Sequence, residues 1–151
     1  MTLQSATENA RQKPNSSQAW VMLGVVQVRT ARLLDAKSSL EQAQYLKPDL
    51  SNTLAWLGYV EALLGDEGEA EKHLDQALAD NPQHLQGLLG RGLLYLNKGE
   101  SKDALEMLSD AEAISPDNFE LLYNKGKALI NLQRYEEASE VYQGVLKTRP
   151  C

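Results

Sequence analysis

The chain has 151 residues, of which 42% are hydrophobic and 24% are charged, and its net charge is −6. This is the composition of a globular protein of one domain, and the acidity argues against a nucleic-acid partner, which would need a clustered basic face. No apolar run approaches the roughly 18 residues of a membrane span, the first residues lack the apolar stretch of a secretory signal, and the single cysteine, Cys151, excludes a disulfide framework.

Helical spacing of apolar residues runs through the whole chain. Residues 1 to about 12 predict one helix, Ala19–Thr30 a second and Asp35–Leu46 a third. Pro48 ends the third helix, because the residue before a proline is pushed out of the helical region. Asp49 and Ser51 are then candidate caps of the next helix.

The same pattern returns at a constant period of about 34 residues, within the range typical of a repeat array. All five prolines lie on this period, and so do four glycines and four alanines. In such an array each unit buries its face against its neighbours. The period predicts a half unit at 1–16 and four full units at 17–50, 51–84, 85–118 and 119–151, in one array of antiparallel helix pairs. The lone half unit suggests a fragment of a longer chain.

The glycine and alanine positions imply close helix packing. Glycine inside a helix costs about 1 kcal/mol relative to alanine, so a sequence keeps it where a side chain would block a contact. We expect each glycine to face the alanine in the second helix of its own unit, with large residues such as Leu40, Leu74, Leu108 and Tyr142 filling the remaining volume. The pairs are Gly24 with Ala36, Gly58 with Ala70, Gly92 with Ala104 and Gly126 with Ala138.

With its constant period, its Trp20-x-x-Leu23-Gly24 run and a proline closing each unit, the chain resembles the tetratricopeptide repeat family. The resemblance covers residues 17–150 as four units, with 1–16 as half a unit. It implies an all-α, right-handed superhelical solenoid whose first helices line a concave groove. It also implies a non-catalytic function, namely the binding of a peptide or protein segment. Arg91 and Lys125 stand where earlier units have leucine, so they must reach solvent or find a partner.

The family geometry places side chains of the first helix of each unit in the groove. We expect an apolar groove in the first three units, with Trp56 and Tyr59 beside an unfilled space over Gly90, and a more polar groove in the fourth. An amphipathic or extended segment would bind there. The residues expected to line the groove are Val21, Val25, Trp56, Tyr59, Leu89, Leu93, Asn97, Tyr123, Asn124, Lys127 and Asn131.

Two other kinds of site find little support. Some members of the family hold a C-terminal carboxylate with a clamp of lysine, arginine and asparagine, but the corresponding positions here carry no cation in either register. His73 and His84 are the only histidines, too few for a zinc site, and no catalytic arrangement or phosphate-binding loop appears. We therefore expect no cofactor, no metal and no enzymatic activity. The acidic second helices are interpreted as a solvated face.

The expected function is that of a cytoplasmic scaffold or adaptor that binds a protein or peptide segment. Two alternatives remain at this stage. The array could be the substrate-selecting segment of a larger enzyme, or a docking or spacer segment of a bacterial secretion, pilus or polysaccharide-export assembly. Because residues 136–151 would leave an apolar end exposed, end-to-end self-association is also expected, and Cys151 could form an intermolecular disulfide.

Overall fold

The structure is a computed structural model that describes residues 1–148. Within these residues the chain forms nine α-helices and no strand. The three helices expected first agree with the observed bounds to within two residues. The expected closing Pro150 and Cys151 lie outside the described residues. The helices are α1 (Leu3–Gln12), α2 (Ser17–Arg29), α3 (Leu33–Leu46), α4 (Leu50–Leu64), α5 (Glu67–Asp80), α6 (Leu85–Asn97), α7 (Ser101–Ile114), α8 (Phe119–Asn131) and α9 (Tyr135–Thr148).

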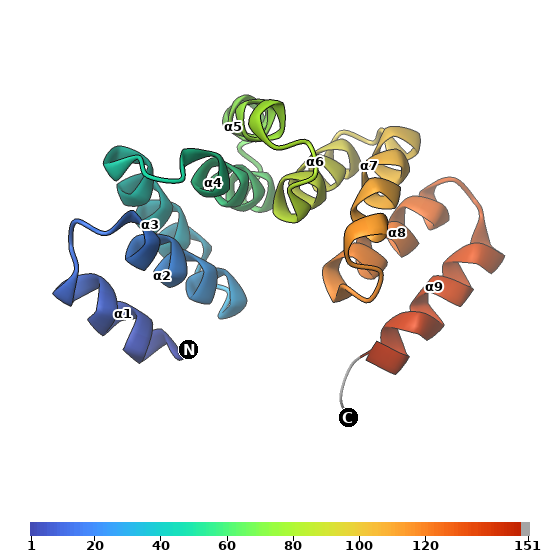
Figure 1. Cartoon of the computed structure of the whole chain (residues 1–151). Helices are drawn as coiled ribbons and strands as arrows, with labels where there is room; N and C mark the ends of the chain where they lie inside the picture. The colour runs from blue at the N-terminus through green and yellow to red at the C-terminus, as the bar shows by residue number, and fades with distance from the viewer. Residues whose placement is uncertain (149–151) are drawn as a thin grey trace.

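The helices form an arch, with α1 at one end and α9 at the other (Figure 1). Each helix packs against the next, and α2, α4, α6 and α8 also contact one another in turn. Across the described residues α3, α5, α7 and α9 make no such backbone contacts among themselves. In a curved array, the helices that contact the corresponding helices of neighbouring units lie on the inside of the curve. The helices without such contacts lie on the outside. We therefore call α2, α4, α6 and α8 the inner helices and α3, α5, α7 and α9 the outer helices.

A glycine at the centre of each inner helix lets the paired outer helix approach. A Cβ atom built on Gly58 would lie 2.6 Å from Cγ of Leu74 and 3.3 Å from the carbonyl oxygen of Ala70. Such distances leave no room for a methyl group. The expected close contact is thus confirmed, and it recurs at Gly24 with Leu40 and Ala36, and at Gly92 with Leu108 and Ala104. At Gly126 the nearest atoms all belong to Tyr142.

The turn inside each unit repeats as closely as the helices. Ala31, Gly65, Gly99 and Gln133 occupy the same position in successive units, and all four have a positive φ, between 61° and 85°. This left-handed conformation is free for glycine but costly for other residues. The array therefore uses one turn geometry throughout, and Ala31 and Gln133 adopt it without a glycine.

The inner helices begin with different caps. Ser16, His84 and Asn118 each accept a hydrogen bond from the backbone N–H three residues later. Asp49 precedes α4 with φ 52° and makes no side-chain cap, and Ser51 lies inside the helix, so the expected capping by these two residues is wrong. A side chain at a left-handed position points away from the N–H groups it would have to accept from.

Helix α9 exposes large apolar side chains at the end of the described chain. The exposed fraction is 62% for Tyr135 and 73% for Leu146. The self-association expected of this end stays a prediction, since part of the segment lies outside the described residues.

A concave interaction surface

The inner face is accessible at its N-terminal end. Val21 and Val25 of α2 are half-buried. Val21 and Met22 line part of a hollow of about 500 Å³, together with Ser17 and Gln18 of α2, Pro48 and Asp49 before α4, and Asn52 of α4. This mixture of apolar and polar lining suits an apolar side chain flanked by polar backbone.

The centre of the inner face is filled. Tyr59 of α4 and Leu89 and Leu93 of α6 have exposed fractions of 4%, 0% and 7%, so they lie in the core rather than along an open groove. The space expected over Gly90 does not exist, because a Cβ there would lie 2.8 Å from Cδ2 of Leu74 and 3.4 Å from Cα of Tyr59. The missing side chain brings α6 against α4.

Trp56 lies at the edge of this closed centre. Its ring is half-buried and meets the ring of Tyr59 edge to face, with centroids 6.3 Å apart. Part of its surface remains available to a partner, although most of the ring packs within the array, against both neighbouring clusters of apolar side chains.

A side-chain hydrogen bond joins α4 to α8 across the inner face. The hydroxyl of Tyr59 on α4 donates to Oε2 of Glu120 on α8, at 2.5 Å. Burial, and then the neighbouring Glu120 carboxylate, raise the pKa of Tyr59 well above its ordinary value. The tyrosine therefore stays protonated and remains the donor.

The C-terminal end of the inner face is open and aromatic. Tyr123 of α8 is 48% exposed; it stacks on Phe119 with centroids 6.2 Å apart and meets Tyr142 of α9 edge to face. Nζ of Lys127 lies 5.6 Å from the centroid of the Tyr123 ring, within cation–π range. Lys127 is exposed, so this end combines an accessible aromatic ring with a cation.

The asparagines expected in the groove differ in their placement. Asn131 is exposed, as expected. Asn124 is buried, with an exposed fraction of 7%, because it lies between α8 and the rest of the array. Asn97 is exposed as a residue, but its Nδ2 donates to the carbonyl oxygen of Ala62 on α4 at 2.9 Å. Asn97 thus ties α6 to α4, and only its remaining surface faces solvent.

The two cations that replace leucine have found partners, as the sequence required. Arg91 forms an ion pair with Asp75 and a hydrogen bond to the hydroxyl of Tyr95, and Nζ of Lys125 lies 2.8 Å from Oε1 of Glu112. Both pairs join an inner helix to the outer helix of the preceding unit. Such partly exposed pairs contribute little energy each, but they fix the register between units.

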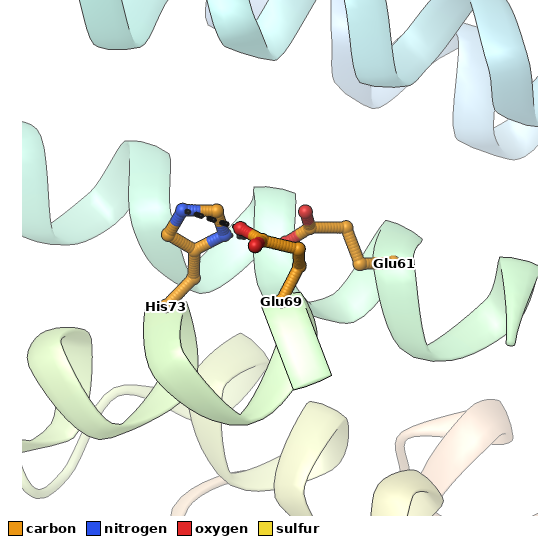
Figure 2. A group of neighbouring side chains, drawn as sticks. All are labelled: Glu61, Glu69 and His73. Atoms are coloured by element: carbon orange, nitrogen blue, oxygen red, sulfur yellow. Dashed lines mark hydrogen bonds and ion pairs between the residues drawn. The ribbon is translucent and has the colours of Figure 1, made fainter. Parts of the chain in front are cut away.

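Sequence reasoning missed a buried, hydrogen-bonded pair of side chains between α4 and α5 (Figure 2). Glu61 is 2% exposed and His73 7% exposed, and Oε1 of Glu61 lies 2.5 Å from Nδ1 of His73. On the other side of the ring, Nε2 lies 3.9 Å from Oε2 of the exposed Glu69. The signal for this pair was present in the sequence, because Glu61 is the one carboxylate in an otherwise apolar helix and a histidine follows in the next helix.

The three side chains offer ligand atoms within 4.8 Å of one another. However, the 2.5 Å separation of Glu61 and Nδ1 is a hydrogen bond with no space for an ion, which leaves only Nε2 and Glu69 on the other side. The arrangement is better described as a bridge between helices. In the first unit the residues at the same register are Gln27 and Ser39, whose side chains are joined at 2.7 Å without any charge.

His84 serves the array rather than a ligand. The N–H of Gly87 donates to its Nδ1 at 3.3 Å, and its Nε2 lies 2.9 Å from Oδ1 of Asn52 on α4. These two bonds define a neutral ring with the proton on Nε2. Burial is the largest cause and lowers the pKa of His84, while Asp49 opposes the shift.

The arch of stacked helix pairs and its concave inner face define a helical repeat protein of the kind that acts generally as a protein-interaction scaffold. Family profiles described as tetratricopeptide repeat match residues 17–50, 64–119 and 98–150. The chain belongs to the tetratricopeptide repeat family. Proteins of this family are generally non-catalytic. Comparison with curated proteins finds no match.

Solved structures share the fold. TTC0263, a thermophilic tetratricopeptide repeat protein of Thermus thermophilus, has 23% identity and a TM-score of 0.76 over 89% of this chain and 75% of its own. MamA from Desulfovibrio magneticus has 17% identity and a TM-score of 0.67 over 97% and 82%. A further MamA structure has 20% identity and a TM-score of 0.65 over 97% and 85%. Among the described residues no helix is long and apolar enough to cross a membrane.

Proposed function

We propose that this chain is a non-catalytic scaffold that binds a peptide or protein segment along the inner face of its arch. The observation that carries the proposal is the accessibility of both ends of that face. Val21 and Val25 provide a half-buried apolar surface on α2, and Tyr123 and Lys127 provide an exposed aromatic ring and a cation on α8. Tyrosine is among the residues enriched at the centres of protein interfaces.

The partner that fits is an amphipathic or extended segment. An apolar side chain of the partner would enter the hollow beside Val21 and Met22, and an aromatic or acidic group would meet Tyr123 and Lys127. Asn131 would add a polar contact at the same end. The acidic outer helices are assigned no part in binding, and three of their carboxylates are paired with Arg91, Lys98 and Lys125.

Capture experiments with matched variants test the proposal. Val25→Asp and Lys127→Glu each alter one end of the inner face, whereas Glu106→Lys changes the charge of an exposed residue on the outer helix α7. Proteins cross-linked to the chain in an extract of its source organism are quantified by mass spectrometry. We expect both inner variants to lose at least about tenfold of the partner signal, which is the effect of losing about 1.4 kcal/mol of binding free energy.

The outer variant should capture the same proteins as the unaltered chain. Circular dichroism of each variant confirms that the helices are retained. The proposal is wrong if the inner variants capture the same set at the same level, or if Glu106→Lys reduces the capture as much as they do.

A further inference from the structure

The Tyr59–Glu120 bond joins two units that are not neighbours in the array. Tyr59 belongs to the second unit and Glu120 to the fourth, and α4 and α8 make no backbone contact with each other. The bond therefore passes over the inner side of α6, which lies between them. Its donor is buried and its acceptor is ionisable, and hydrogen bonds to charged groups are among the strongest in proteins.

The two junctions that the bond spans are unequal. Helix α6 packs against α4 over much of its length, but on the inner side α8 touches α6 only slightly. Gly90 explains the close packing of α6 against α4, because the absence of a side chain there lets the backbone of Tyr59 approach α6. The residue at the same register of α8 is Asn124, a larger residue that is 7% exposed. The inner side of the α6–α8 junction thus depends on the bond more than the α4–α6 junction does.

The bond lies where the inner face is closed. Leu89 and Leu93 of α6 are 0% and 7% exposed, yet the residues at the same two registers of α8, Tyr123 and Lys127, are exposed. Side chains at these registers are accessible when no neighbour covers them. The burial of Leu89 and Leu93 therefore reflects the position of the neighbouring helices and is not a property of the register.

A second observation shows that the closed centre is imperfect. Gln86 of α6 stands one unit before Glu120, at the same register, and its Nε2 is buried without a hydrogen-bond partner. A buried donor without a partner destabilises the state that contains it.

We infer that the Tyr59–Glu120 bond is a latch that holds the inner face closed over α6, and that breaking it frees α8 to move and exposes Leu89 and Leu93. This inference rests on the proposed function, for which it supplies a regulation: the open form presents a longer apolar surface to the bound segment. A segment that supplies its own donor to Glu120, or its own acceptor to Tyr59, replaces the latch as it binds.

The latch can be tested without any partner. Tyr59→Phe removes the donor and keeps the buried ring, and Glu120→Ala removes the acceptor from a half-buried position. Tyr123→Phe is the matched control, since it deletes a tyrosine hydroxyl from the same face. Amide hydrogen exchange is followed for each helix, together with fluorescence of the dye ANS, which binds exposed apolar surface.

We expect both latch variants to increase amide exchange in α6 and α8 by about tenfold, the effect of losing one charge-assisted hydrogen bond, and to increase ANS fluorescence. The double variant should resemble either single variant, because both remove the same bond. Tyr123→Phe should behave like the unaltered chain.

The latch is refuted if exchange in α6 and α8 is unchanged, or if it rises equally in all helices, which would indicate general destabilisation. It is also refuted if the two single effects add in the double variant. Because no partner is present, these outcomes are distinct from failure of the capture experiment. If the latch variants show the expected exchange but the capture experiment finds no partner, the movement of α8 is supported and its proposed role in binding is not.

Discussion

Gly58 shows how one missing side chain determines the spacing of two helices. Gly58→Ala would place a methyl group 2.6 Å from Cγ of Leu74 and 3.3 Å from the carbonyl oxygen of Ala70. We expect the free energy of unfolding to fall by about 1–3 kcal/mol, the usual cost of overpacking, although alanine favours the helix. Urea denaturation followed by circular dichroism measures the change.

Gly144→Ala is the control, because Gly144 lies inside α9 with nothing within 4 Å of its Cβ position. There alanine should raise the free energy of unfolding by about 0.5–1 kcal/mol, through helix propensity alone. Equal shifts of the same sign in the two variants would show that Gly58 is not a packing residue.

The difference between what could and could not be predicted begins at single residues. The contact at Gly58 was predictable, because a glycine repeated inside helices implies a neighbour. The burial of Tyr59 was not predictable, because it depends on how closely α6 approaches α4, which the missing side chain at Gly90 decides. Arg91 was intermediate: its need for a partner was evident, but not that the partner is Asp75.

At the scale of helices, the Glu61–His73 pair holds α4 against α5 with two buried ionisable groups. His73→Val leaves the carboxylate of Glu61 buried without its partner, and we expect the free energy of unfolding to fall by about 3–5 kcal/mol. Adding Glu61→Leu gives the two residues found at this register in the fourth unit, Leu129 and Val141. The double variant should return to within about 1 kcal/mol of the unaltered chain, or exceed it.

Thermal and urea unfolding of His73→Val, of Glu61→Leu and of the double variant measure the three changes in the free energy of unfolding that form a double-mutant cycle. If the two single effects simply add, the side chains do not interact, and the bridge between α4 and α5 is incorrect.

His84 makes the start of α6 sensitive to acid. Its pKa is lowered in the folded chain, mainly by burial, so the unfolded chain binds the proton more readily. Stability is therefore complete above the ordinary pKa of 6.5 and declines as the pH falls below that value towards the lowered pKa. Protonation of Nδ1 also removes the cap to Gly87, a bond worth about 1 kcal/mol.

His84→Asn copies Asn118, the cap at the same register of α8. We expect this variant to keep the stability of the chain at pH 8 and to lose less of it between pH 7 and pH 5. The melting temperature across that range measures the difference. Identical pH profiles for the two proteins would mean that His84 does not titrate in the way its surroundings indicate.

Among the elements themselves, the helices were easier to predict than the ends that cap them. Apolar spacing and prolines locate the helices because both act over several residues. The cap expected at Asp49 failed because the loop around Pro48 takes positive φ values at Lys47 and Asp49, and a chain of ordinary residues gives no local sign of such a turn.

At the scale of the whole molecule, the backbone contacts of the described helices run only within a unit and between neighbouring units, so the arch should unfold in parts. In Gly126→Val, the added side chain would overlap the ring of Tyr142, whose Cζ lies 2.5 Å from the Cβ position. We expect α8 and α9 to lose their protection from amide exchange while α2 and α3 keep theirs, since these two helices make no backbone contact with the described part of the last unit. Exchange measured by mass spectrometry separates the two ends.

Loss of protection in α2 and α3 together with α9 would show instead that the arch unfolds as one cooperative body.

The curvature of the arch was the property least predictable from the sequence. The period predicts that units stack, but not that the junctions on the two sides of α6 differ, which depends on the close contact at Gly90 and on the Tyr59–Glu120 bond.

The left-handed turn at Ala31, Gly65, Gly99 and Gln133 has a consequence for how such a chain changes in length. A block of one whole repeat added or lost at any of these turns rejoins the backbone in the conformation it left, with every inner glycine again opposite its outer partner. A block of another length would rotate all later helices out of phase. Natural relatives of this arch should therefore grow and shrink by whole helix pairs, and single-residue insertions should be confined to the turns.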